Sequence, residues 1–254
     1  MPEAQRRTAG RIRARHIGLA AFGLVLFAAF IALGVWQVER RSWKLALIAR
    51  VDERVHAAPV PAPGPKEWPA VTAARDEYRH VRLKGHLLNG KETLVYTATD
   101  LGPGYWVVTP LQRDDGTTVL VNRGFVPTDK RDPATRPQGE VKGEVTITGL
   151  LRMSEPGGAF LRSNKPLENR WYSRDVAAIA KARHLPDVAP YFVDADRTPN
   201  PGGLPVGGLT RIHFRNAHLQ YAITWFALAL LVIVGAFIVV KYERKPDEGA
   251  GGAE

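Results

Sequence analysis

The stretch IGLAAFGLVLFAAFIALGVWQV, residues 17–38, contains no charged side chain and decides how this chain is arranged. A helix rises about 1.5 Å per residue, so roughly 22 residues cover about 33 Å, close to the ~30 Å hydrocarbon core of a bilayer. A second uncharged stretch, LQYAITWFALALLVIVGAFIVV, occupies residues 219–240 near the other end. We therefore expect two membrane-spanning helices, with both termini on one side of the membrane and the intervening residues on the other.

The flanks of the two apolar stretches indicate the orientation. The first stretch is too long for the h-region of a signal peptide and no A-x-A site follows it, which predicts an uncleaved anchor. Basic residues precede the first stretch and follow the second, which places both termini in the cytoplasm. Arg40, Arg41 and Lys44 give a contrary signal, but a long loop is translocated largely regardless of its charge.

Composition narrows the functional classes. The chain has 254 residues, a net charge of +10 and no cysteine, so disulfides, thiol catalysis and cysteine-ligated metals are excluded. With methionine only at Met1 and Met153, the chain has too few sulfur ligands for a soft copper site, which argues against a copper chaperone. An excess of basic residues is typical of proteins that bind nucleic acid or membranes. Because zinc-finger and RNP-like motifs are absent from the sequence, we expect the lipid bilayer as a partner and no nucleic acid.

The order of these features predicts the following segments: a basic cytoplasmic tail (1–16), a first transmembrane helix (17–38), an amphipathic helical extension (39–58), a Pro-rich linker (59–77), an external β-rich domain (78–209), a lead-in with the second transmembrane helix (210–240), and a cytoplasmic tail (241–254). The extension could lie on the membrane surface or pack under the external domain. The linker reads as stiff and extended because proline is excluded from helix interiors and central strands.

The external domain shows closely spaced strand signals between Tyr78 and Met153, with a tight turn at residues 114–116 (DDG) and a later strand at 189–193. Ser173 is the expected N-cap of one short helix that ends before Pro186. The predicted fold class is therefore membrane α+β: two transmembrane helices flank an external antiparallel β-rich, barrel-like domain with one or more short helices.

One cluster could carry chemistry. Asn216 is the expected N-cap of the second span, and His218, Tyr221 and Trp225 can share a helix face in its first turns. The outer end of the antiparallel first span brings Trp36 and Gln37 to similar depth. A neutral imidazole between aromatic and apolar walls is what an axial haem ligand requires. The alternative is an interfacial belt of Trp, Tyr and His that binds nothing.

A second candidate is Arg123 in the stretch NRGFVP, residues 122–127, where Gly124 would allow close approach of another backbone. Arg123 could meet a carboxylate, such as a haem propionate or a partner's acid, in a bidentate hydrogen bond; the alternative is a solvated or structurally paired arginine. The remaining histidines show no metal-ligand spacing, and no catalytic motif is present.

Several motifs together resemble the Surfeit locus protein 1 family. They are, in order, residues 34–40 (GVWQVER) with Lys44 following, 105–111 (YWVVTPL), 121–127 (VNRGFVP), 171–175 (WYSRD) and 216–226 (NAHLQYAITWF). Each motif alone is weakly specific, and their ordered combination with the same two-span layout is specific. The sequence departs from the pattern at Phe125, where the family is expected to have Trp.

The resemblance implies a non-enzymatic assembly factor for cytochrome c oxidase, which binds or stabilises haem a for insertion into subunit I, with haem a synthase as a further candidate partner. It implies His218 as the haem ligand. Together with the interfacial cluster, it leads us to expect Trp36, Gln37, Tyr221 and Trp225 as the surroundings of the haem, and Arg40 and Arg123 as partners for propionates or a partner's acids. The expected location is a bacterial inner membrane with the central domain periplasmic; a mitochondrial inner membrane is the alternative. A scaffold that holds oxidase subunits together without a cofactor is the rival function, and a membrane-tethered hydrolase has no motif in its favour.

Overall fold

The computed structural model describes residues 2–159, 161–210, 212 and 216–243, and the side chains of residues 16–159, 161–210, 212 and 216–242. The chain forms two compact units. The first, here called the helix pair, comprises Met1–Ile48 and His213–Glu254; the second, the barrel domain, comprises Ala49–Ile212. Residues 211 and 213–215 of the predicted lead-in and residues 244–254 of the predicted C-terminal tail lie outside the described residues.

Two long helices, α1 (Pro2–His56) and α4 (His218–Glu243), carry the apolar stretches. Each is long and apolar enough to cross a membrane, and only 6% of the residues in the apolar 18-residue segment of each helix are buried within the protein. A core helix of a soluble domain would bury that surface, so these helices need an apolar environment outside the chain.

The helical extension expected after the first span is present, since α1 continues to His56. Its final turns belong to the barrel domain, where Val51 is buried. The Arg54 guanidinium donates to the carbonyls of Glu77 and Ala74, at 3.2 and 2.7 Å. Of the two alternatives for this segment, packing against the domain is therefore the one that the structure contains.

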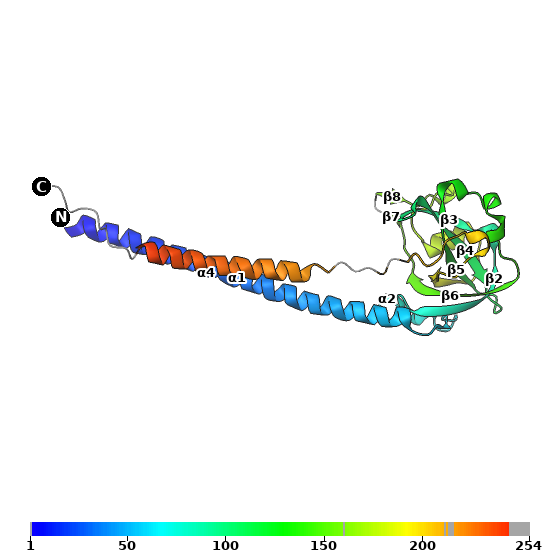
Figure 1. The fold of residues 1–254 in the computed structure, drawn as a ribbon, viewed down its shortest axis with the longest axis horizontal. Helices are drawn as coiled ribbons and strands as arrows, with labels where there is room; N and C mark the ends of the chain where they lie inside the picture. Colours follow the sequence, from blue (N-terminus) through cyan, green and yellow to red (C-terminus); the bar gives the residue numbers. More distant parts are fainter. Residues whose placement is uncertain (1, 160, 211, 213–215, 244–254) are drawn as a thin grey trace. The chain divides into compact units, whose positions relative to one another are not determined.

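The barrel domain contains the strands and the short helices (Figure 1). The strands are β1 (Val60–Pro61), β2 (His80–Leu87), β3 (Thr93–Thr99), β4 (Gly102–Gln112), β5 (Thr118–Pro127), β6 (Glu144–Met153), β7 (Gly158–Ala159), β8 (Arg162–Ser163) and β9 (Val188–Ala195). The α-helices of this domain are α2 (Ala73–Asp76) and α3 (Val176–Ala182). Single 3-10 turns occupy Trp68–Ala70, Asn89–Lys91, Thr128–Lys130, Pro133–Thr135, Pro137–Gly139, Pro166–Glu168 and Pro201–Gly203.

The main sheet has the order β1-β2-β6-β9-β5-β4-β3 and is closed by an additional pairing of β2 with β4. Strands β2, β6, β9, β5 and β4 therefore form a closed ring, which confirms the barrel-like domain. Most neighbours are antiparallel, as expected, but β5 pairs with β9 and β1 with β2 in parallel. The parallel pairs use long connections, which a pattern of local turns does not reveal.

The barrel has two apolar cores because residues alternate across its wall. On β5, Val119 and Val121 join the cluster with Tyr191 and Val193 of β9, whereas the intervening Leu120 joins a second cluster. Trp171 and α3 cover this second cluster, and Ile179 of α3 is fully buried there. Burial on both faces explains why β5 reads as a nearly continuous apolar run.

The structure differs from the sequence-based prediction at residues 59–77. Val60 and Pro61 pair with β2, Ala62 belongs to the barrel core, and the Pro63 carbonyl accepts a hydrogen bond of 2.7 Å from the Tyr191 hydroxyl. These prolines lie on an edge strand and in turns, where no ladder N–H is needed. The segment is therefore part of the folded domain rather than a stiff, extended linker.

Two finer predictions were also incorrect. The first of the strands predicted between Tyr78 and Met153 is β2, which begins at His80 rather than Tyr78, because Tyr78 has a φ of 62°, which is incompatible with a strand. The N-cap of α3 is Asp175, whose carboxylate accepts from the Ala178 amide, whereas the Ser173 hydroxyl donates to the Glu155 carbonyl.

Candidate functional site

The helix pair is antiparallel, as its contacts demonstrate. Phe30 of α1 stacks on Trp225 of α4 with ring centroids 5.8 Å apart. One turn further along α1, Gly34 is buried beneath Phe226: a Cβ at this position would lie 2.5 Å from the phenyl Cε1. Small residues permit such close approach of membrane helices. Gly34 therefore lets the two helices meet just before the polar end of their contact.

At that end Gln37 meets His218. The Gln37 Oε1 atom lies 2.7 Å from the His218 Nδ1 atom, Gln37 is only 9% exposed, and His218 is half-buried. An amide oxygen can only accept a hydrogen bond, so Nδ1 carries the proton and donates. In a neutral imidazole with this tautomer, Nε2 has a free lone pair. No other group among the described residues pairs with His218, so Nε2 is available to a ligand.

The aromatic residues that were predicted to lie near His218 differ in their exposure. Trp36 and Tyr221 are 53% and 55% exposed, so both present aromatic surface outward from the helix pair. Trp225 is partly covered by its stack on Phe30. The Arg40 guanidinium carbon lies 4.1 Å from the ring centroid of Trp43, an exposed cation held over an indole face.

Arg123 belongs to the barrel domain and is only 3% exposed. Its Nη2 donates to the Gly139 carbonyl at 2.6 Å and to Asn200 Oδ1 at 3.1 Å, and burial lowers the pKa of its guanidinium. These contacts join the loop before β6 to the segment after β9. The structure therefore gives Arg123 a set of structural partners within the barrel domain.

The neighbouring Gly124 has the close approach that the sequence suggested. It has a φ of 128°, and a Cβ there would lie 2.1 Å from the Val206 carbonyl oxygen. Phe125 exchanges backbone hydrogen bonds of 2.9 Å with Val206, and its ring is buried against Trp106. An aromatic side chain at position 125 thus serves the packing of the barrel.

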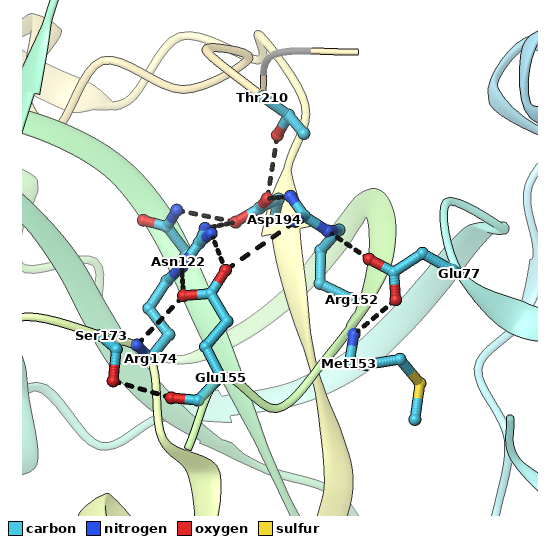
Figure 2. A network of polar contacts seen from close by, with 9 residues as sticks. All are labelled: Glu77, Asn122, Arg152, Met153, Glu155, Ser173, Arg174, Asp194 and Thr210. Carbon is cyan, nitrogen blue, oxygen red and sulfur yellow. Dashed lines mark hydrogen bonds and ion pairs between the residues drawn. The ribbon is translucent and has the colours of Figure 1, made fainter. Parts of the chain in front are cut away.

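A second polar cluster surrounds Asp194 on β9 (Figure 2). Its carboxylate is 3% exposed. It accepts hydrogen bonds from Asn122 at 2.7 Å, Arg174 at 2.8 Å, Arg152 at 2.9 Å and Thr210 at 3.1 Å. Burial lowers the pKa of each arginine, but facing carboxylates outweigh this and raise the pKa overall. Both guanidiniums remain charged and paired, as a structural network requires.

Sequence reasoning missed Phe30, Gly34 and Phe226 as site-forming residues. The available signal was the spacing of small and aromatic residues on the two apolar stretches, which sets where helices can approach. One capping prediction was incorrect: α4 begins at His218, and the Asn216 Oδ1 atom is buried without a hydrogen-bond partner among the described residues. Asn216 therefore does not cap the helix through its side-chain oxygen.

The two apolar helices and the closed barrel define a membrane protein with a small β-barrel domain. The SURF1 family model matches residues 24–230, and the chain belongs to the SURF1 family. Surfeit locus protein 1 of Mus musculus is 42% identical over 225 residues, covering 82% of this chain and 71% of the relative. The Homo sapiens protein is 41% identical over 216 residues (78% and 69%). The SURF1-like protein of Drosophila melanogaster is 35% identical over 232 residues (83% and 74%).

Proposed function

We propose that this protein is an assembly factor for cytochrome c oxidase that holds haem a at His218 for insertion into subunit I. Membership of the SURF1 family supports the assembly role. The observation that supports haem binding is the 2.7 Å contact between Gln37 Oε1 and His218 Nδ1. It fixes the ring tautomer that leaves Nε2 free, and a histidine that donates its other N–H to an oxygen is the usual arrangement of a haem or metal ligand.

The side chains near this contact suit a flat, largely apolar group with acidic edges. His218 would provide the nitrogen ligand, and the exposed faces of Trp36 and Tyr221 would provide apolar contact. Arg40 would offer an exposed cation to a propionate. Haem a, when bound, would supply the iron that this nitrogen binds. Arg123 is left out of the proposed site because its guanidinium is buried and already bonded.

The proposed topology has two passes, with both termini in the cytoplasm and the barrel domain in the periplasm of a bacterial cell. The arginines ahead of the first span and the basic residues after the second support this orientation. Haem a synthase is a candidate donor of the haem and subunit I the candidate acceptor.

The test is a haem measurement on the full chain, purified in detergent from cells that make haem a. Pyridine haemochrome analysis gives the ratio of haem to protein. We expect His218→Ala to lower this ratio at least about tenfold, because the iron loses its ligand. His86→Ala is the matched control, since His86 is an exposed histidine of the barrel domain and its loss should leave the ratio unchanged. An unchanged ratio and spectrum for His218→Ala would remove His218 from the ligand role.

Gln37 is a positioning residue, so its substitution tests the tautomer argument. Gln37→Leu removes the acceptor and should weaken haem retention by roughly 10- to 100-fold, as loss of such supporting hydrogen bonds does at metal sites. Gln37→Glu restores an acceptor oxygen and should recover retention. Purified wild-type protein that lacks haem but co-isolates with subunit I would instead favour the scaffold function.

A further inference from the structure

One face of the barrel domain combines aromatic and cationic side chains around a pocket of about 460 Å³. We call this the tyrosine–arginine surface and define it by Tyr96, Tyr105, Arg131, Arg162 and Tyr172, all of which line the pocket. It lies in a part of the molecule that the proposed haem site does not use.

The three tyrosines form a connected group. Tyr96 of β3 and Tyr105 of β4 are cross-strand partners, with ring centroids 5.9 Å apart and nearly perpendicular rings. The Tyr172 ring lies 6.3 Å from that of Tyr96. The Tyr96 amide donates to the Trp171 carbonyl at 2.8 Å, which fixes residues 171–172 to the exposed edge of β3. The segments that carry the three tyrosines are thus held together by backbone hydrogen bonds. The entropy cost of ordering this wall of the pocket when a ligand binds is therefore small.

Among the described residues, the two arginines contact these rings and form no ion pair with an acid. The Arg162 guanidinium carbon lies 5.6 Å from the Tyr96 ring and 5.4 Å from the Tyr172 ring, and that of Arg131 lies 5.3 Å from the Tyr105 ring. Both side chains are exposed, and neither forms an ion pair within the described parts of the chain. By contrast, Arg170 in the same pocket is paired with Glu168. The pocket therefore carries two uncompensated positive charges.

Two exposed leucines are chain neighbours of residues that line the pocket. Leu161, next to Arg162, is 88% exposed, and Leu167, next to Glu168, is fully exposed. Exposed leucines beside tyrosine and arginine match the composition of protein-binding surfaces, where aromatic residues and arginine carry most of the binding energy.

We infer that the tyrosine–arginine surface binds an acidic segment of a partner protein, with carboxylates at Arg131 and Arg162 and apolar side chains against the tyrosines and leucines. A concave pocket with rigid aromatic walls suits a peptide better than a flat lipid surface. Clusters that bind anionic lipid headgroups usually contain 4–8 basic residues, whereas this pocket has two free ones. The inference is independent of haem binding at His218.

The experiment selects peptides from a random dodecapeptide phage library on the detergent-purified full chain. We expect enrichment of peptides that combine Asp or Glu with Leu or an aromatic residue. The best peptide, fluorescently labelled, should lose at least about tenfold in affinity for the Arg131→Glu/Arg162→Glu protein. Its affinity should also fall with added salt, since exposed charges are screened.

The matched control is Lys66→Glu/Lys142→Glu, which makes the same change in net charge at two exposed lysines of the barrel domain outside the pocket. This variant should keep the affinity, and its circular dichroism should match that of the arginine variant. Peptides without acidic enrichment, or equal binding to the arginine variant, would overturn the inference. So would retention of phosphatidylglycerol, measured by native mass spectrometry, that depends on the two arginines while no acidic peptide binds.

Discussion

The helix pair and the barrel domain differ in how completely the polar groups of His218 and Asp194 are hydrogen-bonded. In the barrel domain, the Asp194 carboxylate accepts four hydrogen bonds from side chains, and the two arginines facing it have further acidic partners. In the helix pair, His218 uses one ring nitrogen on Gln37 and keeps the other free among the described residues. A satisfied network stabilises a fold, whereas an imidazole with a spare lone pair is ready to bind. The contrast distinguishes a carboxylate whose hydrogen-bonding capacity the fold uses from the imidazole on which the proposed function depends.

The largest expected effect is on the barrel domain. Asp194→Ala removes the carboxylate between Arg152 and Arg174 and should destabilise the domain by about 3–5 kcal/mol, because it leaves buried charge uncompensated. Hydrogen-exchange mass spectrometry on the full chain should show faster exchange in β5 and β9, with α4 unchanged. Asp129→Ala, at an exposed aspartate, is the control and should change little. Faster exchange in α4 as well would contradict the separation of the two units.

The next effect is on the helix pair. Gly34→Leu places a side chain where Phe226 already lies, and overpacking of this kind costs about 1–3 kcal/mol. The chain has no cysteine, so a Gly23→Cys/Val232→Cys pair can report helix contact by disulfide formation. A Cβ on Gly23 lies 4.0 Å from Val232 Cγ1.

We expect Gly34→Leu to lower the cross-linking yield several-fold. Gly18→Leu is the matched control on the same helix, because a Cβ at Gly18 meets nothing within 4 Å. Equal loss of cross-linking in both variants would show that added bulk anywhere on α1 separates the helices, and the close approach at Gly34 would then have no special role.

The sequence predicted local patterns well and long-range partners poorly. The apolar stretches, the presence of closely spaced strands and the DDG turn follow from periodicity and turn chemistry, which depend on neighbouring residues. The hydrogen-bond partners of Arg123 are Gly139 and Asn200, which lie far from it in the sequence. Ala62 likewise packs against strands that are far along the chain. The sequence predicted that Gln37 and His218 lie at similar depth in the membrane, but not that they form a hydrogen bond. Two membrane spans determine the depth of a residue but not the rotation of its helix about the helix axis.

A smaller effect tests the capping of α3 in the barrel domain. Asp175 accepts hydrogen bonds from the amides of Ala178 and Gly157, at 3.1 and 3.2 Å. Asp175→Ala should cost about 1 kcal/mol, whereas Asp175→Asn keeps an acceptor oxygen and should stay close to wild type. Exchange rates of the α3 amides measure both. An Asn variant as labile as the Ala variant would mean that the charge at the helix N-terminus, not the cap, stabilises α3.

The smallest effect concerns His80, the barrel counterpart of His218. Its Nδ1 lies 2.8 Å from the Ala57 carbonyl and its Nε2 lies 2.8 Å from the Asp196 carboxylate. Both neighbours accept, so both contacts are hydrogen bonds only when the ring is an imidazolium and both ring nitrogens donate. Burial lowers the pKa of His80, but the hydrogen bonds to Ala57 and Asp196 outweigh it and raise the pKa above its usual value. Unlike His218, this histidine has no free nitrogen for a ligand.

The sign of the pH dependence follows. The pKa of His80 is raised in the folded state. The hydrogen bonds of His80 to Ala57 and Asp196 therefore stabilise the fold fully below about pH 6.5, the ordinary pKa of histidine. This stabilisation is lost as the pH rises through the raised pKa. The contribution should be about 1 kcal/mol or less, because the pair is partly exposed. Hydrogen exchange near Ala57 and Asp196, corrected for intrinsic rates, should show more protection at pH 5.5 than at pH 8.5. His80→Gln should abolish that difference. If the difference persists in His80→Gln, another group carries it, and the two histidines no longer define opposite kinds of site.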